Sequence, residues 1–503
     1  MLSVHAPTAA DPVPAPFNMA AHVLAHAGRL ADKSAMQILR PTGAERWSYA
    51  RLEAAVRGTG TGLLRAGLQP GDRVLLRLGN TPEFPVAYLG AIAAGLVPVP
   101  TSSQLTAAEI GKMAAQVDPA LVIAGDGIAL PEGIPAISEE TLRGFEALPP
   151  CAYDLGDPER LGYIVFTSGT SGKPRAVEHA HRAIWARRMM HQGWYGLGES
   201  DRLLHAGAFN WTYTLGTGLM DPWSVGATAL IPAAGVEAPA LALLLRRFDA
   251  TIFAAAPGVY RQILRHHPKL SLPKLRHGLS AGEALPELTR AHWHAATGTP
   301  IHEALGMSEC STFISSAPGH PAPPGTAGWP QEGRHVAVLR DGAPVPRGEA
   351  GVLAVHRSDP GLFLGYRGQP EETAARFAGP WFLTGDMVEM TEAGAIRYLG
   401  RDDDMMNAGG FRVAPQEVET AMATCPEAGE VAAVEIRVSA EATVIALAHT
   451  GPATAEALAA HAATALARYK QPRIYRQVSA LPRNRNGKID RRSLRQDWPQ
   501  ETK

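Results

Sequence analysis

The sequence is poor in cysteine, with only Cys151, Cys310 and Cys425 among 503 residues. They lie far apart and show neither a CxxC pair nor a metal-type spacing, which argues against a disulfide framework and against a zinc site. The sequence also lacks an excess of either charge, because 47 Lys and Arg residues face 48 Asp and Glu residues. This balance gives no electrostatic reason to expect nucleic acid or an anionic membrane as the main partner.

Long apolar runs are missing as well, since no uninterrupted run reaches the length that spans a bilayer. Residues 1–18 lack the basic start and the apolar core of a secretory signal. We therefore expect a cytoplasmic protein without a membrane span, in a reducing compartment that suits its few thiols.

What is present is the composition of a globular protein, with 46% hydrophobic and 19% charged residues. A chain of this length exceeds what one hydrophobic core usually serves, so at least two domains are expected. Residues 1–16, rich in Pro and Ala, are predicted to be a flexible lead. From residue 17 to about residue 150, helical patterns (52–68, 81–95) and strand-like patterns (72–78, 96–100) alternate as in a layered α/β domain.

An apolar, strand-like run at 163–166 breaks into a loop that contains several hydroxyl groups, two glycines and one lysine. The glycines let backbone N–H groups converge, the hydroxyls add donors and Lys173 adds positive charge, which suits a phosphate group. The loop is not a Walker A motif, because two residues separate its glycines and Pro174 follows the lysine. On composition alone, a plain polar turn is the competing interpretation. The candidate phosphate-binding residues are Thr167, Ser168, Gly169, Thr170, Ser171, Gly172 and Lys173.

Further motifs follow this loop in a fixed order: SAGEALP at 280–286, HEALGMSE at 302–309, GEAGVLAV at 348–355, WFLTGD at 381–386, GRDDDMMNAGGFRVAPQEVE at 400–419 and LPRNRNGKID at 481–490. Together with YIVFTSGTSGKPRAVEH, they resemble the motifs of the adenylate-forming (ANL) superfamily, which includes acyl-CoA synthetases, adenylation domains of peptide synthetases and luciferases. The resemblance implies an α/β fold: a large N-terminal layered AMP-binding domain, 17–402, followed by a small, mobile α+β lid domain, 403–503. Predicted strands at 431–438, 443–449 and 474–478 and a predicted helix at 454–469 fit such a lid.

The resemblance also implies a nucleotide site. The 167–173 loop would grip the β- and γ-phosphates of ATP, Glu309 would offer a carboxylate to Mg²⁺, and Ser308 would offer a hydroxyl to the α-phosphate. Asp386 would accept hydrogen bonds from the ribose diol. Leu305 stands where the family usually has an aromatic residue, which leaves apolar contact rather than stacking for the adenine. The implied adenine and ribose residues are Gly282, Glu283, Ala284, Glu303, Ala304, Leu305, Gly306, Met307, Asp386 and Arg401.

Aromatic residues gather in the segment 203–230, and by themselves they indicate a core cluster more often than a binding site. In the superfamily this segment forms one wall of the carboxylic-acid pocket. By that resemblance Phe209, Trp211 and Tyr213 contact the acid, with Trp211 the first candidate. The small Ala281 allows close approach of a flat ligand.

Two histidines follow the phosphate loop in a segment, 176–191, that is predicted to be helical. His179 and His181 lie two positions apart and would point in different directions on a helix, so a metal site is not expected. His181 is predicted to cap or to pack.

Lys488 lies in a basic, Gly-containing loop that composition alone would make a solvated turn. Its motif resembles LPxTxSGKI, whose lysine bridges the carboxylate and the α-phosphate during adenylation. The acidic run 402–404 is also a solvated turn on composition, yet by resemblance Asp403 is the hinge of the lid. Rotation about this hinge would withdraw Lys488 and bring a CoA tunnel over the site. The implied tunnel residues are Gly409, Gly410, Phe411 and Arg412.

These motifs predict an ATP-dependent acid–CoA ligase that needs Mg²⁺ and releases pyrophosphate. RYKQPR at 468–473 resembles CoA ligases more than peptide-synthetase domains, and no carrier segment follows before Lys503, so free CoA is the expected acceptor. The nearest alternative is a stand-alone adenylation enzyme that loads a separate carrier protein; a luciferase-like oxygenase and a nucleotide-binding regulator are the others. The segment 203–230 is closer to benzoate–CoA ligase-like members than to acetyl-CoA synthetases, while aryl and short- or medium-chain acids both stay open. A monomer or a homodimer is expected.

Overall fold

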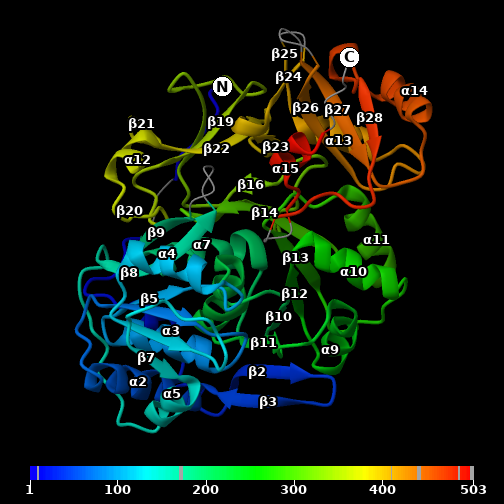
Figure 1. Ribbon diagram of the computed structural model, residues 1–503. Coiled ribbons are helices and arrows are strands. Elements are labelled where there is room, and N and C mark those ends of the chain that lie inside the picture. Colours follow the sequence, from blue (N-terminus) through cyan, green and yellow to red (C-terminus); the bar gives the residue numbers. More distant parts are fainter. Residues whose placement is uncertain (8–10, 169–173, 409–410, 439–442, 485–487, 499–503) are drawn as a thin grey trace. The chain divides into compact units, whose positions relative to one another are not determined.

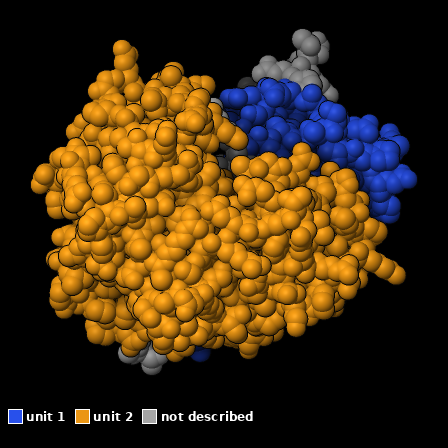
Figure 2. Space-filling view, turned by 90° about the horizontal axis from the view of Figure 1, so that it is seen from below, with its two compact units in different colours: residues 1–4, 337–354, 383–503 blue, residues 5–336, 355–382 orange. Residues whose placement is uncertain are grey.

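The computed structural model describes residues 1–503 except 8–10, 169–173, 409–410, 439–442, 485–487 and 499–503. The chain forms two compact units, which Figure 2 distinguishes. Unit 1 comprises residues 1–4, 337–354 and 383–503, and unit 2 comprises residues 5–336 and 355–382. The limits of the units fall inside β1 (Val4–His5), β17 (Val336–Arg340), β19 (Ala350–His356) and β22 (Trp381–Met390). The domain limits 16/17 and 402/403 stay predictions, and the first of these segments includes β1 (Val4–His5).

Unit 2 contains a nine-stranded sheet with the order β16-β15-β14-β13-β12-β10-β11-β2-β3 (Figure 1). The six strands from β14 to β2 run parallel, and antiparallel strands close both edges. Short apolar runs form the parallel strands because both faces of such a sheet are buried. The bounds are β2 (Ser34–Arg40), β3 (Gly43–Ser48), β10 (Arg202–His205), β11 (Thr228–Pro232), β12 (Ile252–Ala255), β13 (His277–Ala281), β14 (Ile301–Met307), β15 (Ser311–Ser315) and β16 (Trp329–Pro330).

Helices α9 (Leu241–Arg247), α10 (Pro257–His266) and α11 (Glu287–Thr297) cover one face of this sheet. Their buried side chains join those of the strands in one core cluster, in which Trp293 packs 5.8 Å from Phe253. Other short helices of unit 2 are α1 (Met19–Val23), η2 (Thr214–Met220), α8 (Asp221–Ser224), η3 (Ala238–Ala240) and α12 (Pro370–Ala375), and the short strand β21 covers Phe377–Ala378.

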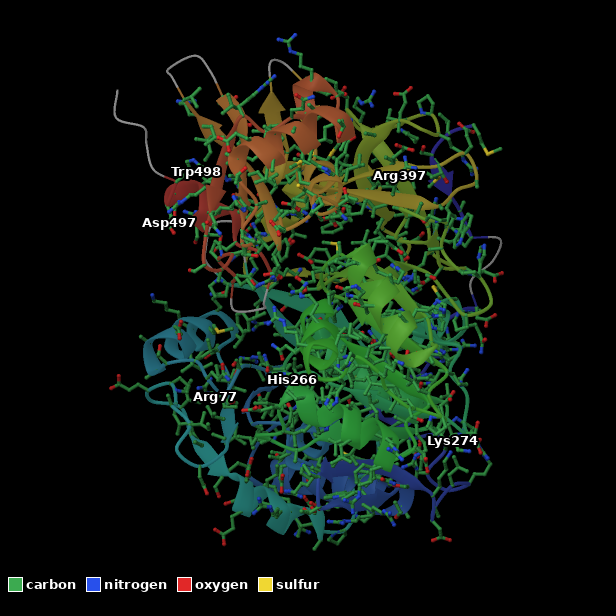
Figure 3. The ribbon with its side chains drawn as sticks, turned by 90° about the vertical axis from the view of Figure 1, so that its right-hand side faces the viewer. Arg77, His266, Lys274, Arg397, Asp497 and Trp498 are labelled. Atoms are coloured by element: carbon green, nitrogen blue, oxygen red, sulfur yellow. The ribbon has the colours of Figure 1, made fainter. Side chains whose placement is uncertain are left out.

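A second, parallel sheet in unit 2 has the order β5-β4-β6-β7. The predicted helices are confirmed as α2 (Tyr49–Arg65) and α3 (Glu83–Ala93), and the predicted strands as β4 (Arg73–Arg77) and β5 (Val97–Pro100). Arg77 is fully buried at the end of β4, where its guanidinium donates to the carbonyls of Ser102 (2.7 Å) and Leu105 (2.9 Å) (Figure 3). The other elements are α4 (Ala107–Val117), β6 (Leu121–Ala124), β7 (Ala136–Ser138) and α5 (Glu139–Glu146).

The helix predicted over 176–191 is wrong at its start. Residues 174–180 form β9 (Pro174–Ala180), which pairs antiparallel with β8 (Leu161–Ser168), while β20 (Gly365–Tyr366) pairs with the other edge of β9. Pairing with the preceding strand β8 and with the distant strand β20 satisfies the backbone groups of β9 and overrides its local helical pattern. Only then do α6 (Ala183–Ala186), α7 (Arg188–Met190) and η1 (His191–Tyr195) follow.

Unit 1 ends in an α+β module, as predicted. The expected strands are β26 (Val431–Arg437), β27 (Thr443–His449) and β28 (Ile474–Gln477), and the expected helix is α14 (Ala455–Ala465). Trp498, labelled in Figure 3, packs with Leu481 and Leu494 against the inner residues of β26 and β27. The other elements of unit 1 are β18 (Ala343–Pro344), β23 (Ile396–Arg401), η4 (Asp402–Asp404), β24 (Met406–Ala408), β25 (Phe411–Val413), α13 (Pro415–Met422), η5 (Arg468–Lys470) and α15 (Arg491–Gln496). Among the described residues, none of the helices combines the length and the apolar character needed to cross a bilayer.

The prediction for His181 is confirmed, since this side chain both packs and caps. Its Nδ1 accepts a hydrogen bond of 3.1 Å from the backbone N–H of Met19, the first residue of α1. Burial, followed by the charge of Arg160, lowers the pKa of His181 from 6.5 to about 3. The ring is therefore neutral at neutral pH and can accept from Met19.

Acid should destabilise the fold through this ring. The imidazole of His181 has a pKa of 6.5 in the unfolded chain and of about 3 in the folded chain. The contribution of the neutral ring to folding stability is therefore complete above pH 6.5 and declines as the pH falls. We expect His181→Asn, whose amide oxygen accepts without titrating, to show a smaller fall of the thermal midpoint between pH 7 and pH 4.5. The exposed His266 (Figure 3) provides a matched control as His266→Asn. Identical pH profiles for His181→Asn and the wild type would contradict this assignment.

Candidate active site

The motif 302–309 places a buried carboxylate just beyond the end of β14. Glu309 is 6% exposed, and its Oε1 accepts a hydrogen bond of 2.7 Å from the hydroxyl of Tyr366. The backbone of Glu309 accepts a second bond, of 2.8 Å, from the N–H of Phe363. Burial raises the pKa of Tyr366, and the Glu309 charge adds to the rise, so the phenol stays protonated and donates. Tyr366 lies 57 positions from Glu309 in the sequence, and the structure brings the two side chains together.

Ser308 is held from the other side of the motif. His179 contacts its carbonyl oxygen through Nε2 at 2.8 Å, and the imidazole stacks on Tyr163 with ring centroids 4.8 Å apart. Burial lowers the pKa of His179 to about 4, so the ring is neutral and Nε2–H donates. His179 therefore supports the Ser308 backbone.

The predicted adenine segments lie at the ends of neighbouring parallel strands. Ala281 ends β13 and pairs with Ala304 of β14, and Gly282 follows with a φ of +96° that favours glycine. The carboxylate of Glu303 accepts from the N–H of Leu285 at 2.8 Å and from Arg290 at 3.0 Å, which fixes the turn 282–286. Burial raises the pKa of Glu303 to about 7. Of the remaining predicted residues, Glu283 and Ala284 lie in this turn, and Leu305, Gly306 and Met307 lie in β14.

Gly306 is required where it stands, because β14 and β15 shift register between Leu305 and Gly306. A Cβ atom at Gly306 would lie 2.4 Å from the carbonyl oxygen of Ser311. The strand can therefore reach Ser308 only with glycine at this position.

Two of the three predicted acid-wall aromatics lie against the end of β13. The ring of Trp211 fills the space where a Cβ of Gly282 would come within 2.7 Å, and it meets Tyr213 edge to face at 5.1 Å. The hydroxyl of Tyr213 donates to the carbonyl of Leu279 at 3.2 Å. Phe209 instead packs in the core, 2% exposed and 5.5 Å from the ring of Phe84.

A cavity of about 20 Å³ lies beside these elements, and Ser308 is part of its wall. Thr212, between Trp211 and Tyr213, also lines it, whereas Phe209, Trp211, Tyr213 and Ala281 are not among its lining residues. The lining consists of Met19, Tyr163, His179, Ala183, Ile184, Arg187, Thr212, Leu215, Met220, Ser308, Ser311 and Gly361.

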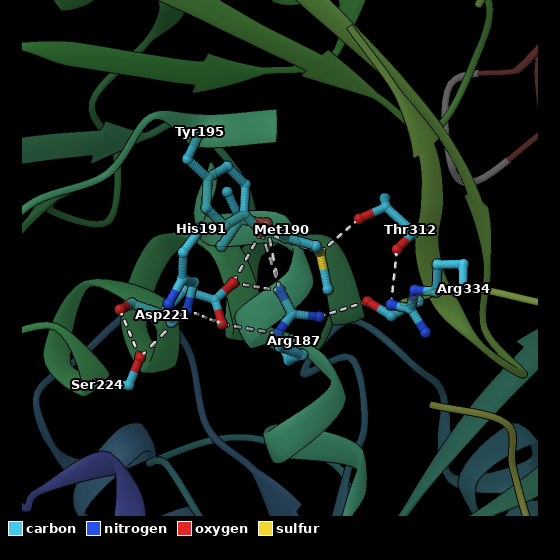
Figure 4. A network of polar contacts seen from close by, with 10 residues as sticks. Arg187, Met190, His191, Tyr195, Asp221, Ser224, Thr312 and Arg334 are labelled. Carbon is cyan, nitrogen blue, oxygen red and sulfur yellow. Dashed lines mark hydrogen bonds and ion pairs between the residues drawn. The ribbon is translucent and has the colours of Figure 1, made fainter. Parts of the chain in front are cut away.

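A buried ion pair stands at this cavity, and no sequence motif predicted it. Arg187 donates from Nε to Asp221 Oδ1 (2.9 Å) and from Nη2 to Asp221 Oδ2 (2.5 Å), and Figure 4 shows the two groups facing each other. The hydroxyl of Tyr195 donates to the same carboxylate at 2.8 Å, and Arg187 Nη1 donates to Ser311. Burial opposes both charges, yet Asp221 raises the pKa of Arg187, and Arg187 and His191 lower the pKa of Asp221.

Within unit 1, the predicted ribose residues meet. Arg401 Nη1 donates to Asp386 Oδ1 (3.1 Å) and to the carbonyl of Thr384 (2.9 Å). Burial raises the pKa of Asp386, while the positive charges of Arg401 and Lys488 oppose this rise. Lys488 closes a turn in which its N–H donates to the side chain of Asn484 (3.1 Å).

Several predicted residues lie outside the described residues or lack a described side chain. The phosphate loop from Gly169 to Lys173 and the tunnel glycines Gly409 and Gly410 belong to the first group. The strand β8 leads to this loop through Thr167 and Ser168, and Ser168 pairs with Pro174. For Asp403, Phe411 and Arg412, the structure gives the backbone elements η4 and β25.

Magnesium is the metal that the motif implies, and the donor set at Glu309 fits it. Mg²⁺ is usually held by one or two carboxylates together with substrate phosphates and water rather than by an all-protein cage. Glu309 offers such a carboxylate, oriented by a neutral hydroxyl donor. Among the described residues, no group of three or more His, Cys, Asp or Glu side chains is arranged to hold a metal ion.

Comparison with known proteins gives the same picture over nearly the whole chain. The family model for the AMP-binding enzyme matches residues 23–367, and that for the AMP-binding enzyme C-terminal domain matches residues 417–488. The chain is 29% identical to acyl-coenzyme A synthetase ACSM2, mitochondrial, of Rattus norvegicus, over 97% of this chain and 92% of the relative. It is 32% identical to benzoate–CoA ligase of Thauera aromatica, over 89% of this chain and 90% of the relative. The structure is similar to that of a benzoate CoA ligase from Burkholderia xenovorans LB400, with a TM-score of 0.84, 28% identity and coverage of 95% and 100%.

Proposed function

The chain belongs to the family of AMP-binding enzymes and is an AMP-forming acid–thiol ligase, and from this premise we propose how its residues activate a carboxylic acid and pass it to CoA. The acid is aryl or of short to medium chain length. The relatives named above are CoA ligases and synthetases, which favours free CoA over a carrier protein as the acceptor.

In the first half-reaction, a carboxylate oxygen of the acid attacks the α-phosphorus of ATP. The new O–P bond forms as the bond to the β-phosphate oxygen breaks, and pyrophosphate leaves. Lys488, the Ser308 hydroxyl and the 167–173 loop would neutralise the charge that grows on the phosphate oxygens. Glu309 would hold Mg²⁺, which neutralises phosphate charge when bound, and Asp386 with Arg401 would hold the ribose.

In the second half-reaction, the CoA thiolate attacks the acyl carbon of the acyl-adenylate. The C–S bond forms as the C–O bond to AMP breaks, which yields the thioester and AMP. Rotation about Asp403 would withdraw Lys488 and bring residues 409–412 over the site, where glycines let a thin pantetheine arm pass close to backbone. Tyr366 positions Glu309 through the 2.7 Å hydrogen bond.

The observation that carries the proposal is the meeting of two predicted nucleotide segments at the ends of neighbouring parallel strands. Gly282 follows β13 and Ser308 with Glu309 follows β14. Ligands of open parallel sheets bind outside the carboxyl ends of the strands, because loops and unpaired N–H groups converge there. A cytoplasmic location and a monomeric or homodimeric state are part of the proposal.

Acid-dependent exchange of labelled pyrophosphate into ATP tests the first half-reaction. We expect exchange with at least one member of a panel of aryl and aliphatic acids in the presence of Mg²⁺, and thioester formation once CoA is added. Leaving out the acid is the control. The absence of exchange with every acid, together with no heat of Mg·ATP binding, would overturn the proposal.

A further inference from the structure

The cavity of about 20 Å³ beside Ser308 has a lining of two chemical kinds. Ala183, Ile184, Leu215 and Met220 contribute apolar side chains to this lining, whereas Tyr163, Thr212, Ser308, Ser311 and Arg187 contribute polar ones. All of the lining residues belong to unit 2. A space of this size holds about one water-sized group and no aromatic ring.

Three hydroxyl groups of the lining residues are available for hydrogen bonding. Tyr163, Thr212 and Ser308 line the cavity, and among the described residues their side-chain oxygens form no hydrogen bond. The ring of Tyr163 is nevertheless fixed, because it stacks on His179 at 4.8 Å and packs against Tyr88 at 6.1 Å. Hydroxyls held in a partly buried wall without partners leave hydrogen-bonding capacity for a group inside the cavity.

The charge at the cavity is already compensated. Arg187 and Asp221 face each other through two hydrogen bonds, and Arg187 Nη1 is engaged by Ser311. Arg187 is therefore not a free counter-ion. A second carboxylate placed there would lose its hydration without gaining an unpaired cation.

From this arrangement we propose that the cavity receives a hydroxyl group of the carboxylic acid, so that hydroxy-substituted acids are the preferred substrates. The substrate hydroxyl donates to and accepts from the hydroxyl groups of Tyr163 and Thr212, while the rest of the acid stays outside this cavity, which is too small to hold it. Unsubstituted acids leave these oxygens unpaired, and dicarboxylic acids bring an uncompensated charge. The inference rests on the proposed function, because it names the substrate class of the same site.

Matched acids test the inference. The specificity constant kcat/KM for pyrophosphate exchange is measured with benzoate and its three hydroxy isomers, with butanoate and 3-hydroxybutanoate, and with benzene-1,3-dicarboxylate. We expect at least one hydroxylated acid to exceed its unsubstituted partner about tenfold or more, as the gain of one buried hydrogen bond implies, and the dicarboxylate to be the poorest. A cavity filled only by water would give equal values of kcat/KM for hydroxylated and unsubstituted acids. That result would overturn the inference and leave the proposed function standing.

The Tyr163→Phe variant assigns the preference to the cavity. Among the described residues the Tyr163 hydroxyl forms no hydrogen bond, so the fold should persist, which an unchanged thermal midpoint verifies. We expect the ratio of kcat/KM for hydroxylated over unsubstituted acid to fall about tenfold. Tyr88→Phe is the matched control. Tyr88 packs on the same ring and does not line the cavity, and its buried hydroxyl likewise has no hydrogen-bond partner in the part of the chain that the structure describes. An unchanged ratio in Tyr163→Phe, or an equal fall in both variants, contradicts the inference. No exchange with any acid would overturn the proposed function and this inference together.

Discussion

Lys488→Ala is expected to abolish adenylation while leaving the transfer to CoA largely intact. If Lys488 bridges the carboxylate and the α-phosphate, its loss removes a positive charge from the point where negative charge grows in the transition state. Loss of one preorganised group of this kind costs about 100-fold or more in rate. The thiolate attack on a preformed acyl-adenylate does not need that charge, since in the proposed second step the lid has carried Lys488 away.

Two assays separate the half-reactions. Acid-dependent pyrophosphate exchange reports the first, and thioester formation from a chemically prepared acyl-adenylate and CoA reports the second. Arg492→Ala provides the control, because Arg492 is an exposed cation only four positions further along the chain. An equal loss of both half-reactions in Lys488→Ala would show that the residue supports the fold or both steps, contrary to the assigned role.

The sequence allowed the order of the motifs and most elements to be predicted, because both depend on local patterns. The alternation of residues 52–100 gives α2, β4, α3 and β5 within a few residues of the expected limits. The start of α2 at Tyr49, earlier than predicted, follows from Ser48, whose side chain accepts from the N–H of Arg51. The strand β9 was mispredicted because its conformation is fixed by β8 and β20, and the latter lies nearly two hundred positions away.

The supporting contacts of the site were not predictable for the same reason. Tyr366 and Glu309 are 57 positions apart, and Arg187 and Asp221 are 34 apart. A buried charge pair has no local pattern, since an isolated Arg or Asp in a sequence is most often a solvated side chain. Composition alone could not separate the aromatic residues of the segment 203–230, because Phe209 packs in the core whereas Trp211 lies at Gly282; that Trp211 contacts the acid stays a prediction.

Removing Asp221 is the second change with a large expected effect. The side chains of Arg187 and Asp221 are only 8% and 0% exposed, and Asp221 also accepts from Tyr195. In Asp221→Ala the guanidinium of Arg187 stays buried without its counter-ion, which costs about 3–5 kcal/mol of folding stability. We therefore expect a marked fall in the midpoint of thermal unfolding of the unit that contains residues 5–336.

The double variant Arg187→Met/Asp221→Leu decides between loss of a charge partner and loss of packing. Because it removes both charges and keeps apolar volume, it should recover most of the midpoint lost in Asp221→Ala. Glu199→Ala breaks the solvent-exposed pair with Arg29 and should cause no comparable shift, since exposed pairs contribute little. If the double variant is as unstable as Asp221→Ala, shape complementarity around residue 221, rather than compensation of the Arg187 charge, is what the fold depends on there.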